Sequence, residues 1–334
     1  MSAYSLVIAA SAIVILSYFY NLIAKRTNIP SVLLLIATGI VVKQAMNYFE
    51  VGRIDWFPYL ELLGIVGLIM IVLEAALDLK LERKKMPLIG KSLLVSLLGL
   101  VASSFAAAFI IHLILPDFTW LQAMIYAVPL SILSSAIIIP SVIYLPEKKK
   151  EFMIYESTFS DILGIMLFYL LISLAEPGSN QDAVGSFLWS FLLTIVISAV
   201  VSYGLIYIFQ NIKTQVKTFL LIAILILLYA IGKQFHISSL IIILVFGLVI
   251  SNSNLFFPGF LKRTLKVESV QSLFHELHIV TGETAFIVRT FFFVIFGITI
   301  VLSSLLSVKV ILVSALILAS IYGLRFVMFQ IFLG

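Results

Sequence analysis

Long runs of apolar residues follow one another along this 334-residue chain, with only short interruptions between them. A helix needs about 20 apolar residues to cross roughly 30 Å of hydrocarbon, and runs of this kind recur from one end of the chain to the other. Hydrophobic residues make up 62% of the sequence and charged residues only 11%, whereas soluble domains carry about 25% charged residues. The sequence therefore predicts an all-α, polytopic membrane protein.

Breaks that contain proline, glycine or charged residues divide the apolar runs into about eleven predicted transmembrane helices. These helices are expected at residues 4–24, 31–48, 58–79, 88–115, 120–145, 152–175, 184–209, 217–232, 237–251, 281–303 and 309–333. The first run ends at Lys25-Arg26 rather than at a small-residue cleavage site. We interpret it as a retained span and not as a signal peptide.

Residues 262–280 differ from the spans because they are mostly polar. Apolar side chains recur among them at helical spacing, which predicts an amphipathic helix at the cytoplasmic interface: Val270, Leu273, Phe274 and Leu277. The segment also contains His275 and His278, three residues apart, whereas the zinc motif of metalloproteases has its histidines four apart. We expect no metal there. The two histidines either sense cytoplasmic pH, because histidine titrates between about pH 5 and 8, or simply form one face of the helix.

Lysine and arginine are distributed unequally between the two sets of alternate loops. One set holds fifteen basic residues, namely Lys25, Arg26, Lys80, Arg83, Lys84, Lys85, Lys91, Lys148, Lys149, Lys150, Lys213, Lys217, Lys262, Arg263 and Lys266, and the other holds four, namely Lys43, Arg53, Lys233 and Lys309. Because cytoplasmic loops carry the excess of basic residues, we expect a cell-membrane protein with its N-terminus outside and its C-terminus in the cytoplasm. The asymmetry also explains the net charge of +5, so we expect no nucleic-acid partner.

The chain contains no cysteine, which excludes disulfides, thiol catalysis and thiolate metal sites. Its sequence shows no phosphate-binding glycine loop and no nucleophile–base set of the kind that enzymes use. We therefore expect neither an enzyme nor a bound cofactor.

Several charged residues fall inside the apolar spans: Glu74, Asp78, Glu156, Asp161, Glu283, Arg289 and Arg325. An ionised side chain at the centre of a bilayer costs at least about 2.5 kcal/mol, so such groups pair with each other, face a watery cavity or move ions. The first possibility, structural salt bridges between helices, is the simplest alternative to an ion pathway.

Three of these residues leave both explanations open. Glu74 and Asp78 are four residues apart on one helical face, and we favour their pairing with Arg83 or Lys84 over a cation-attracting funnel. Arg289 is expected either to line the ion path and stabilise the site, or to pair with Glu283 or reach the lipid headgroups.

Asp161 carries the strongest functional pattern. Ser157 lies four residues earlier, on the same helical face, and such oxygen donors are the ligands that hard cations prefer. Low dielectric disfavours the charged form of a carboxyl group, which increases its tendency to bind a proton. An aspartate that holds either a proton or a cation, but not both, is sufficient to couple two opposed fluxes.

The predicted span at residues 120–145 contains a second feature of this kind. Two prolines, Pro129 and Pro140, flank several serines within one hydrophobic segment. Pro140 removes a backbone donor and disturbs the carbonyl one turn earlier, near Ala136. Transporters use the carbonyls of such interrupted helices as ion ligands. An ordinary proline kink is the alternative.

These motifs resemble those of the monovalent cation:proton antiporters, also called sodium/proton exchangers. The Glu-Ser-x-x-Asn-Asp motif of the electroneutral branch is similar to residues 156–161, with Ser160 in place of the asparagine. Further similar motifs follow the family order across most of the chain: Leu73-Glu74-Ala75-Ala76-Leu77-Asp78-Leu79, Ser134-Ser135-Ala136, Gly282-Glu283-Thr284, the phenylalanine-rich run ending at Gly297, and Gly323-Leu324-Arg325.

The resemblance implies the roles of individual residues. Asp161 would bind the cation and the proton, with further oxygen ligands from Ser157, Ser160, Ser134 and Ser135. Glu156 would pair with Arg325 and stabilise the site without carrying ions.

The resemblance also implies the inverted-repeat antiporter fold. Residues 1–80 and 184–303 would form a dimerisation scaffold, and residues 88–175 and 309–333 a mobile core. The protein would form a homodimer in the lipid bilayer and work by alternating access. Relatives have further helices after the one that matches Arg325, including the partner that crosses the interrupted helix, so we expect a C-terminally truncated gene product.

The sequence thus predicts a secondary transporter that exchanges Na⁺ or K⁺ for protons and contributes to pH homeostasis. Because Ser160 is not a second acidic residue, we favour one-for-one exchange. The alternatives are a ligand-gated potassium efflux system, or channel-like member of the same superfamily, and a membrane scaffold that transports nothing.

Overall fold

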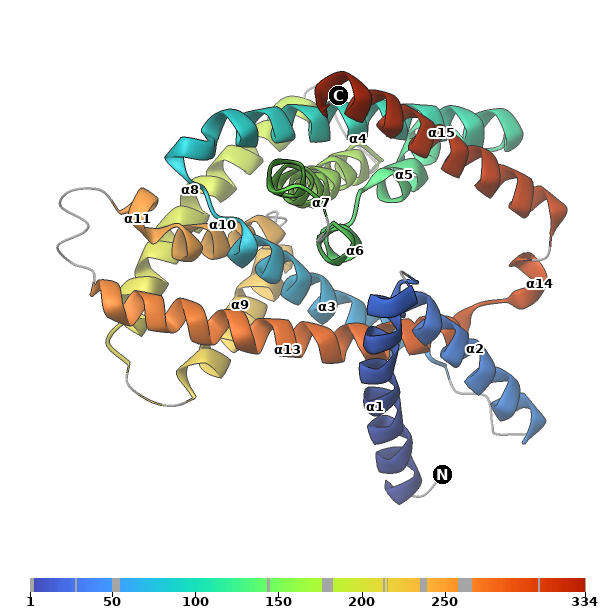
Figure 1. The fold of residues 1–334 in the computed structure, drawn as a ribbon, viewed down its shortest axis with the longest axis horizontal. Helices are drawn as coiled ribbons and strands as arrows, with labels where there is room; N and C mark the ends of the chain where they lie inside the picture. The colour runs from blue at the N-terminus through green and yellow to red at the C-terminus, as the bar shows by residue number, and fades with distance from the viewer. Residues whose placement is uncertain are drawn as a thin grey trace. The chain divides into compact units, whose positions relative to one another are not determined.

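The computed structural model describes residues 3–27, 29–49, 55–142, 145–175, 183–212, 214, 216–234, 239–257, 266–305 and 307–333. Within this part of the chain the regular structure is entirely helical (Figure 1). In hydrocarbon every backbone N–H and C=O must be satisfied within its own segment, which a helix achieves. Nine of the described helices are long and apolar enough to cross a membrane. The prediction of an all-α, polytopic membrane protein is confirmed.

The helices follow the predicted spans closely at most positions. Their bounds are α1 (Ala3–Thr27), α2 (Ser31–Tyr48), α3 (Phe57–Asp78), η1 (Arg83–Lys85), α4 (Met86–Ile114), α5 (Trp120–Ser131), α6 (Ser135–Ser141), α7 (Glu147–Ala175), α8 (Ala183–Phe209), α9 (Lys217–Gln234), α10 (Ser239–Ser251), α11 (Ser253–Phe256), α13 (Val267–Thr299), α14 (Leu302–Leu305) and α15 (Val308–Leu333). The predicted span at 120–145 is divided into α5 and α6.

One predicted boundary is wrong. The polar segment that we expected as a separate interfacial helix continues without a break into the next span, and together they form the 33-residue helix α13. No proline interrupts this stretch. Gly282, which lies where the two predicted segments join, weakens a helix by only about 1 kcal/mol relative to alanine, which does not end so long a helix.

The chain divides into two compact units, which we describe separately. Unit 1 comprises Met1–Glu74, Phe209–Leu227 and Lys266–Val301, and unit 2 comprises Ala75–Ile208, Leu228–Leu265 and Leu302–Gly334. The division into a dimerisation scaffold and a mobile core remains a prediction.

In unit 1, α2 and α13 cross at two glycines. A Cβ atom on Gly39 would meet the carbonyl oxygen of Val294, and one on Gly297 would meet the carbonyl oxygen of Ile36. Small residues allow such close approach of membrane helices, whose association depends on tight van der Waals packing. α1 joins this pair through a buried hydrogen bond between Ser17 Oγ and Thr290 Oγ1 at 2.7 Å.

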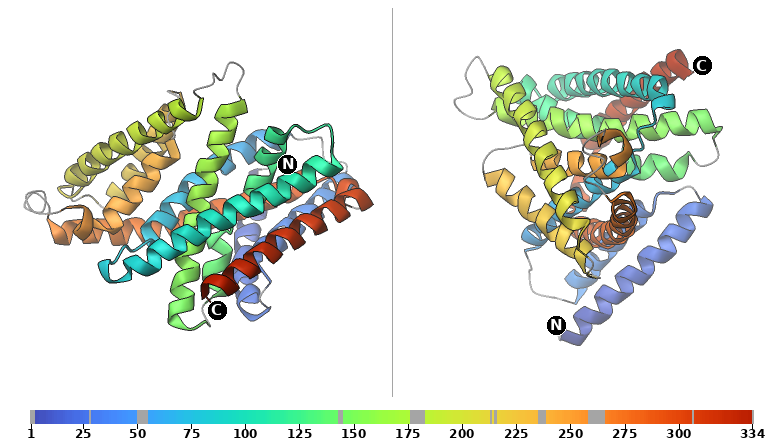
Figure 2. Two further views of the ribbon diagram at one scale, coloured as in Figure 1. Left: turned by 90° about the horizontal axis from the view of Figure 1, so that it is seen from above. Right: turned by 90° about the vertical axis from the view of Figure 1, so that its left-hand side faces the viewer.

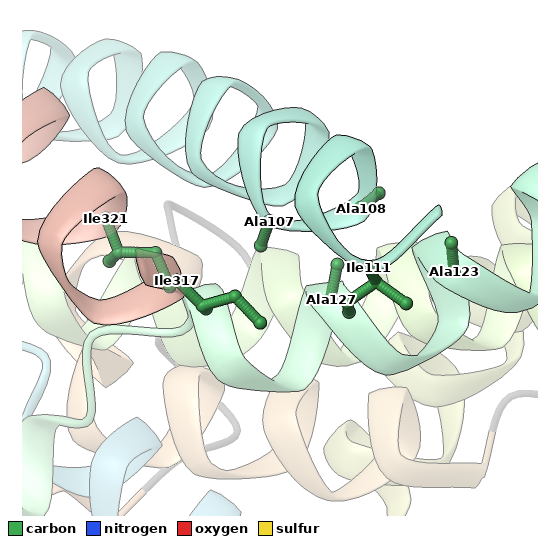
Figure 3. Close-up of a cluster of buried hydrophobic side chains, with 7 residues drawn as sticks. All are labelled: Ala107, Ala108, Ile111, Ala123, Ala127, Ile317 and Ile321. Carbon is green, nitrogen blue, oxygen red and sulfur yellow. The ribbon is translucent and has the colours of Figure 1, made fainter. Parts of the chain in front are cut away.

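In unit 2, α4 packs against α5, α7 and α15. Figure 2 shows α4 and α15 side by side. Alanine and isoleucine side chains of α4, α5 and α15 form a buried cluster at one end of α4 (Figure 3): Ala107, Ala108, Ile111, Ala123, Ala127, Ile317 and Ile321. This packing brings together the helices that carry the predicted site residues.

Candidate ion-binding site

The predicted interruption of the span at 120–145 is present. α5 ends at Ser131 and α6 begins at Ser135. Between them the main chain is extended, with φ −68° and ψ 130° at Ile132 and φ −63° and ψ 121° at Ser134. We had placed the disturbance near Ala136, and the observed break lies a few residues earlier, at residues 132–134.

Asp161 of α7 lies at this break. Its Oδ2 accepts a hydrogen bond from the main-chain N–H of Ser135, at 3.0 Å. Among the residues that the structure describes, no basic side chain lies within salt-bridge distance of Asp161. The carboxylate is therefore held by the interrupted helix and is not neutralised by a neighbouring positive charge.

Glu156, on the same helix, is in the opposite situation. It forms a salt bridge with Arg325 of α15, and the two side chains are 0% and 5% exposed. Arg325 Nη2 also donates to the carbonyl oxygen of Ser131, at 2.8 Å, and to Ser160 Oγ, at 3.2 Å. The pairing that the family resemblance implied is thus present, and Arg325 ties α15 to α7 and to the end of α5. A buried ion pair of this kind needs such additional hydrogen bonds to offset its desolvation.

Ser160 connects the break to α7. Its Oγ accepts the main-chain N–H of Leu133 at 2.9 Å, in addition to the bond from Arg325. Its side chain is fully buried. The hydroxyl therefore holds the interrupted helix in place, and its expected role as an ion ligand remains a prediction.

Two of the other predicted ligands make local hydrogen bonds. Ser157 Oγ donates to the carbonyl oxygen of Ile154 at 3.1 Å. Ser134 precedes α6, and its carbonyl oxygen accepts the N–H groups of Ile137 and Ile138. Both serines lie close in the sequence to the contact between Ser135 and Asp161, so the structure places all the predicted oxygen ligands on α7 or beside the break.

Gly164 contributes to the site in a way that the sequence analysis did not anticipate. It lies three residues after Asp161, on the helical face that receives the side chain of Ile132, and a Cβ atom on Gly164 would meet Ile132 Cγ1 and Cδ1. Ile132 is the first residue of the break, so Gly164 leaves room for the side chain with which the break begins. A lone glycine in an apolar run gives no sequence signal for this contact.

Arg289 lies in unit 1, where Arg289 Nη2 pairs with Glu74 Oε2 at 2.9 Å. α3 and α13 lie side by side in this unit, since Gly64 faces Phe292 and Gly67 faces Val288. Pairing with Glu283, one of the alternatives expected for Arg289, is corrected by this contact between helices. The side chain of Arg83, one of the partners expected for Glu74, lies outside the described residues. Arg289 pairs with Glu74 because α3 and α13 are neighbours. The sequence motifs do not indicate which helices are neighbours, so they could not predict this pair.

The comparisons with known proteins agree with the motifs. The sequence profile of the family described as "Sodium/hydrogen exchanger, transmembrane" matches residues 10–333, so the chain belongs to this family. Comparison with curated proteins gives no match.

Solved structures show the same fold. The chain resembles the structure of the sodium proton antiporter MjNhaP1 from Methanocaldococcus jannaschii with a TM-score of 0.73 at 18% sequence identity, covering 100% of this chain and 79% of that chain. A structure of the same antiporter from an electron-microscopy map gives a TM-score of 0.65 at 16% identity, covering 90% of this chain and 71% of that chain. The predicted antiporter fold is confirmed.

Proposed function

We propose that this protein exchanges a monovalent cation, Na⁺ or K⁺, for protons by alternating access, and that Asp161 is the group for which cation and proton compete. One observation carries the proposal. Of the two carboxylates on this part of α7, Glu156 is neutralised by Arg325, whereas Asp161 contacts the interrupted helix through Ser135. A carboxylate without a basic partner can be neutralised by a proton or by a bound cation.

The surroundings of Asp161 supply further ligands of the right chemistry. Serine hydroxyls and main-chain carbonyls are hard oxygen donors, which suit an alkali cation. Ser135 contacts Asp161 directly, and the other predicted ligands, Ser134, Ser157 and Ser160, lie close to these two residues in the sequence. The interrupted helix places backbone groups at membrane depth, as in other transporters, where such groups coordinate ions.

The residues around Asp161 have a structural role that differs from the proposed ion-binding role of Asp161. Arg325, Glu156 and Ser160 fix the break and α7 relative to each other. The cation and proton then act on a rigid frame, and alternate exposure of Asp161 to the two sides requires the frame to move as one body. We infer that the protein does this as a homodimer in the cell membrane, with its N-terminus outside.

The proposal is tested in proteoliposomes that contain a pH-sensitive dye. A jump in external Na⁺ or K⁺ should produce a proton flux with the wild-type protein and none with Asp161→Asn, which keeps the size of the side chain but cannot be deprotonated. Asp117→Asn is the matched control, because Asp117 is an exposed aspartate between α4 and α5. Unchanged exchange in Asp161→Asn would exclude the mechanism.

The same preparation distinguishes an exchanger from a channel. One-for-one exchange should be insensitive to an imposed membrane potential and should give no unitary currents in planar bilayers. Discrete single-channel currents would instead support a potassium efflux system of the same superfamily.

A further inference from the structure

The inner face of α4 carries polar groups that the proposed exchange mechanism does not use. Ser96, Gly99 and Ser103 follow one another at intervals of three and four residues and so share one face of the helix. Both serines are fully buried. Neither Ser96 Oγ nor Ser103 Oγ has a hydrogen-bond partner among the described residues, and the same holds for Ser104 Oγ, which adjoins this face.

These serines differ from the other buried serines of unit 2. Ser131 Oγ donates to the carbonyl oxygen of Ala127, and Ser198 Oγ donates to that of Thr194, each four residues earlier in its own helix. This is the usual way in which a serine inside a helix satisfies its hydroxyl. The hydroxyls on the inner face of α4 are not satisfied in this way.

Arg325 of the ion pair contacts the same face of α4. The guanidinium group of Arg325 lies directly against Gly99, with Nη1 at 3.6 Å and Cζ at 3.7 Å from the position of a Cβ atom on that glycine. Arg325 Nε and Glu156 Oε2 are buried and lack a partner in the described part of the chain. Among the described residues, the ion pair therefore has a donor and an acceptor without partners, and its arginine lies against the face of α4 that carries the unpartnered serine hydroxyls.

We propose that Ser96, Gly99 and Ser103 form a buried water-binding site, and that ordered water there bonds Glu156 Oε2 and Arg325 Nε. Water fits the chemistry because it both donates and accepts, and buried waters typically make about three bonds to polar groups that would otherwise lack partners. An ion does not fit, because the Glu156–Arg325 pair has no net charge to compensate. Ser96 and Ser103 are thus positioning residues, which hold the arginine that in turn holds the interrupted helix.

This site ends where the inner face of α4 becomes apolar. One turn beyond Ser103 the helix enters the cluster of alanine and isoleucine side chains around Ala107 and Ile111 (Figure 3). Water has no polar partners there. One methionine lies at the proposed water site and another at the apolar cluster. Met328 Sδ lies 3.6 Å from the Cβ position of Gly99, and Met124 packs against the apolar cluster. Both are partly buried.

Pulsed X-ray radiolysis of the protein in lipid nanodiscs tests the proposal, because hydroxyl radicals formed from bound water oxidise nearby methionine. We expect Met328 to be oxidised several-fold faster than Met124 when peptides are quantified by mass spectrometry. Ser96→Ala and Ser103→Ala should each lower the rate at Met328 towards that of Met124. Ser198→Ala is the control and should leave both rates unchanged. Similar rates at the two methionines, or a Met328 rate that the serine variants do not alter, would overturn the proposal.

Gly99→Ala provides a second test, independent of transport. The added methyl group would make ordinary van der Waals contact with Arg325 and Met328, and in a dry interface the better helix propensity of alanine should raise the unfolding temperature. At a hydrated interface the methyl group takes space from water, so we expect a lower unfolding temperature and slower oxidation of Met328. A higher unfolding temperature with unchanged oxidation would contradict the proposal.

Discussion

The main-chain N–H of Leu133 donates a hydrogen bond to Ser160 Oγ at 2.9 Å, and this bond joins the middle of the interrupted helix to α7. Extended main chain at membrane depth has no partner within its own helix, so a side chain must satisfy it. The family motif that residues 156–161 resemble has asparagine at the position of Ser160. The side-chain oxygen of an asparagine can accept the same N–H of Leu133. Serine and asparagine therefore both supply the acceptor and differ in the size of the side chain.

Replacing Ser160 with alanine should therefore destabilise the protein. The change leaves the N–H of Leu133 buried without an acceptor and removes a bond from Arg325, and each lost partner costs about 1–3 kcal/mol. Thermal unfolding in detergent should show a clear decrease for Ser160→Ala and a much smaller one for Ser160→Asn. Ser141→Ala is the control, because Ser141 is exposed and its hydroxyl donates to the carbonyl oxygen of Ile137 in its own helix. Equal unfolding temperatures for Ser160→Ala and the wild type would contradict this role.

The salt bridge between Glu156 and Arg325 should behave as a unit. Arg325→Met leaves a buried carboxylate without its partner, which typically costs about 3–5 kcal/mol. Glu156→Gln combined with Arg325→Met removes both charges, and we expect this double variant to unfold at a higher temperature than Arg325→Met alone. A double-mutant cycle on unfolding temperature measures the coupling. Additive effects of the two single changes would show that the pair is not coupled.

The sequence predicted the helices well, because their signals are local. Apolar run length defined the spans, and the spacing of Ser157 and Asp161 placed them on one face of α7. The interrupted helix was also predicted from Pro129 and Pro140. The family resemblance supplied the pairing of Glu156 with Arg325, which no local pattern contains.

Contacts between helices were less predictable. The partner of Arg289 is Glu74, on a helix more than 200 residues earlier in the chain (|i−j| = 215), and helical periodicity does not specify which helices become neighbours. The break was placed near Ala136 because proline is its visible cause. Its actual position depends on tertiary contacts, namely Leu133 with Ser160 and Ile132 with Gly164.

Gly164 should not tolerate a side chain. An alanine Cβ at this position would meet the side chain of Ile132, which must move and displace the beginning of the break. Overpacking of this kind costs about 1–3 kcal/mol. We expect Gly164→Ala to lower both the unfolding temperature and the exchange rate, and Ile132→Ala in the same chain to restore part of the stability by making room. If the double variant is less stable than Gly164→Ala, the two side chains do not compete for the same space.

An added side chain at the crossing of α2 and α13 in unit 1 should destabilise the protein more than Gly164→Ala does. A Cβ atom on Gly297 meets main-chain atoms of Ile36, which cannot rotate away as a side chain can, so the helices themselves must separate. We expect Gly297→Ala to cost about 3 kcal/mol, at the upper end of overpacking effects. Gly282→Ala is a control in the same helix, because nothing lies within 4 Å of its Cβ position, and alanine there should stabilise α13 by about 0.5–1 kcal/mol. Thermal unfolding of the two variants should therefore shift in opposite directions, and a Gly297→Ala variant as stable as Gly282→Ala would show that α2 and α13 do not cross at this residue.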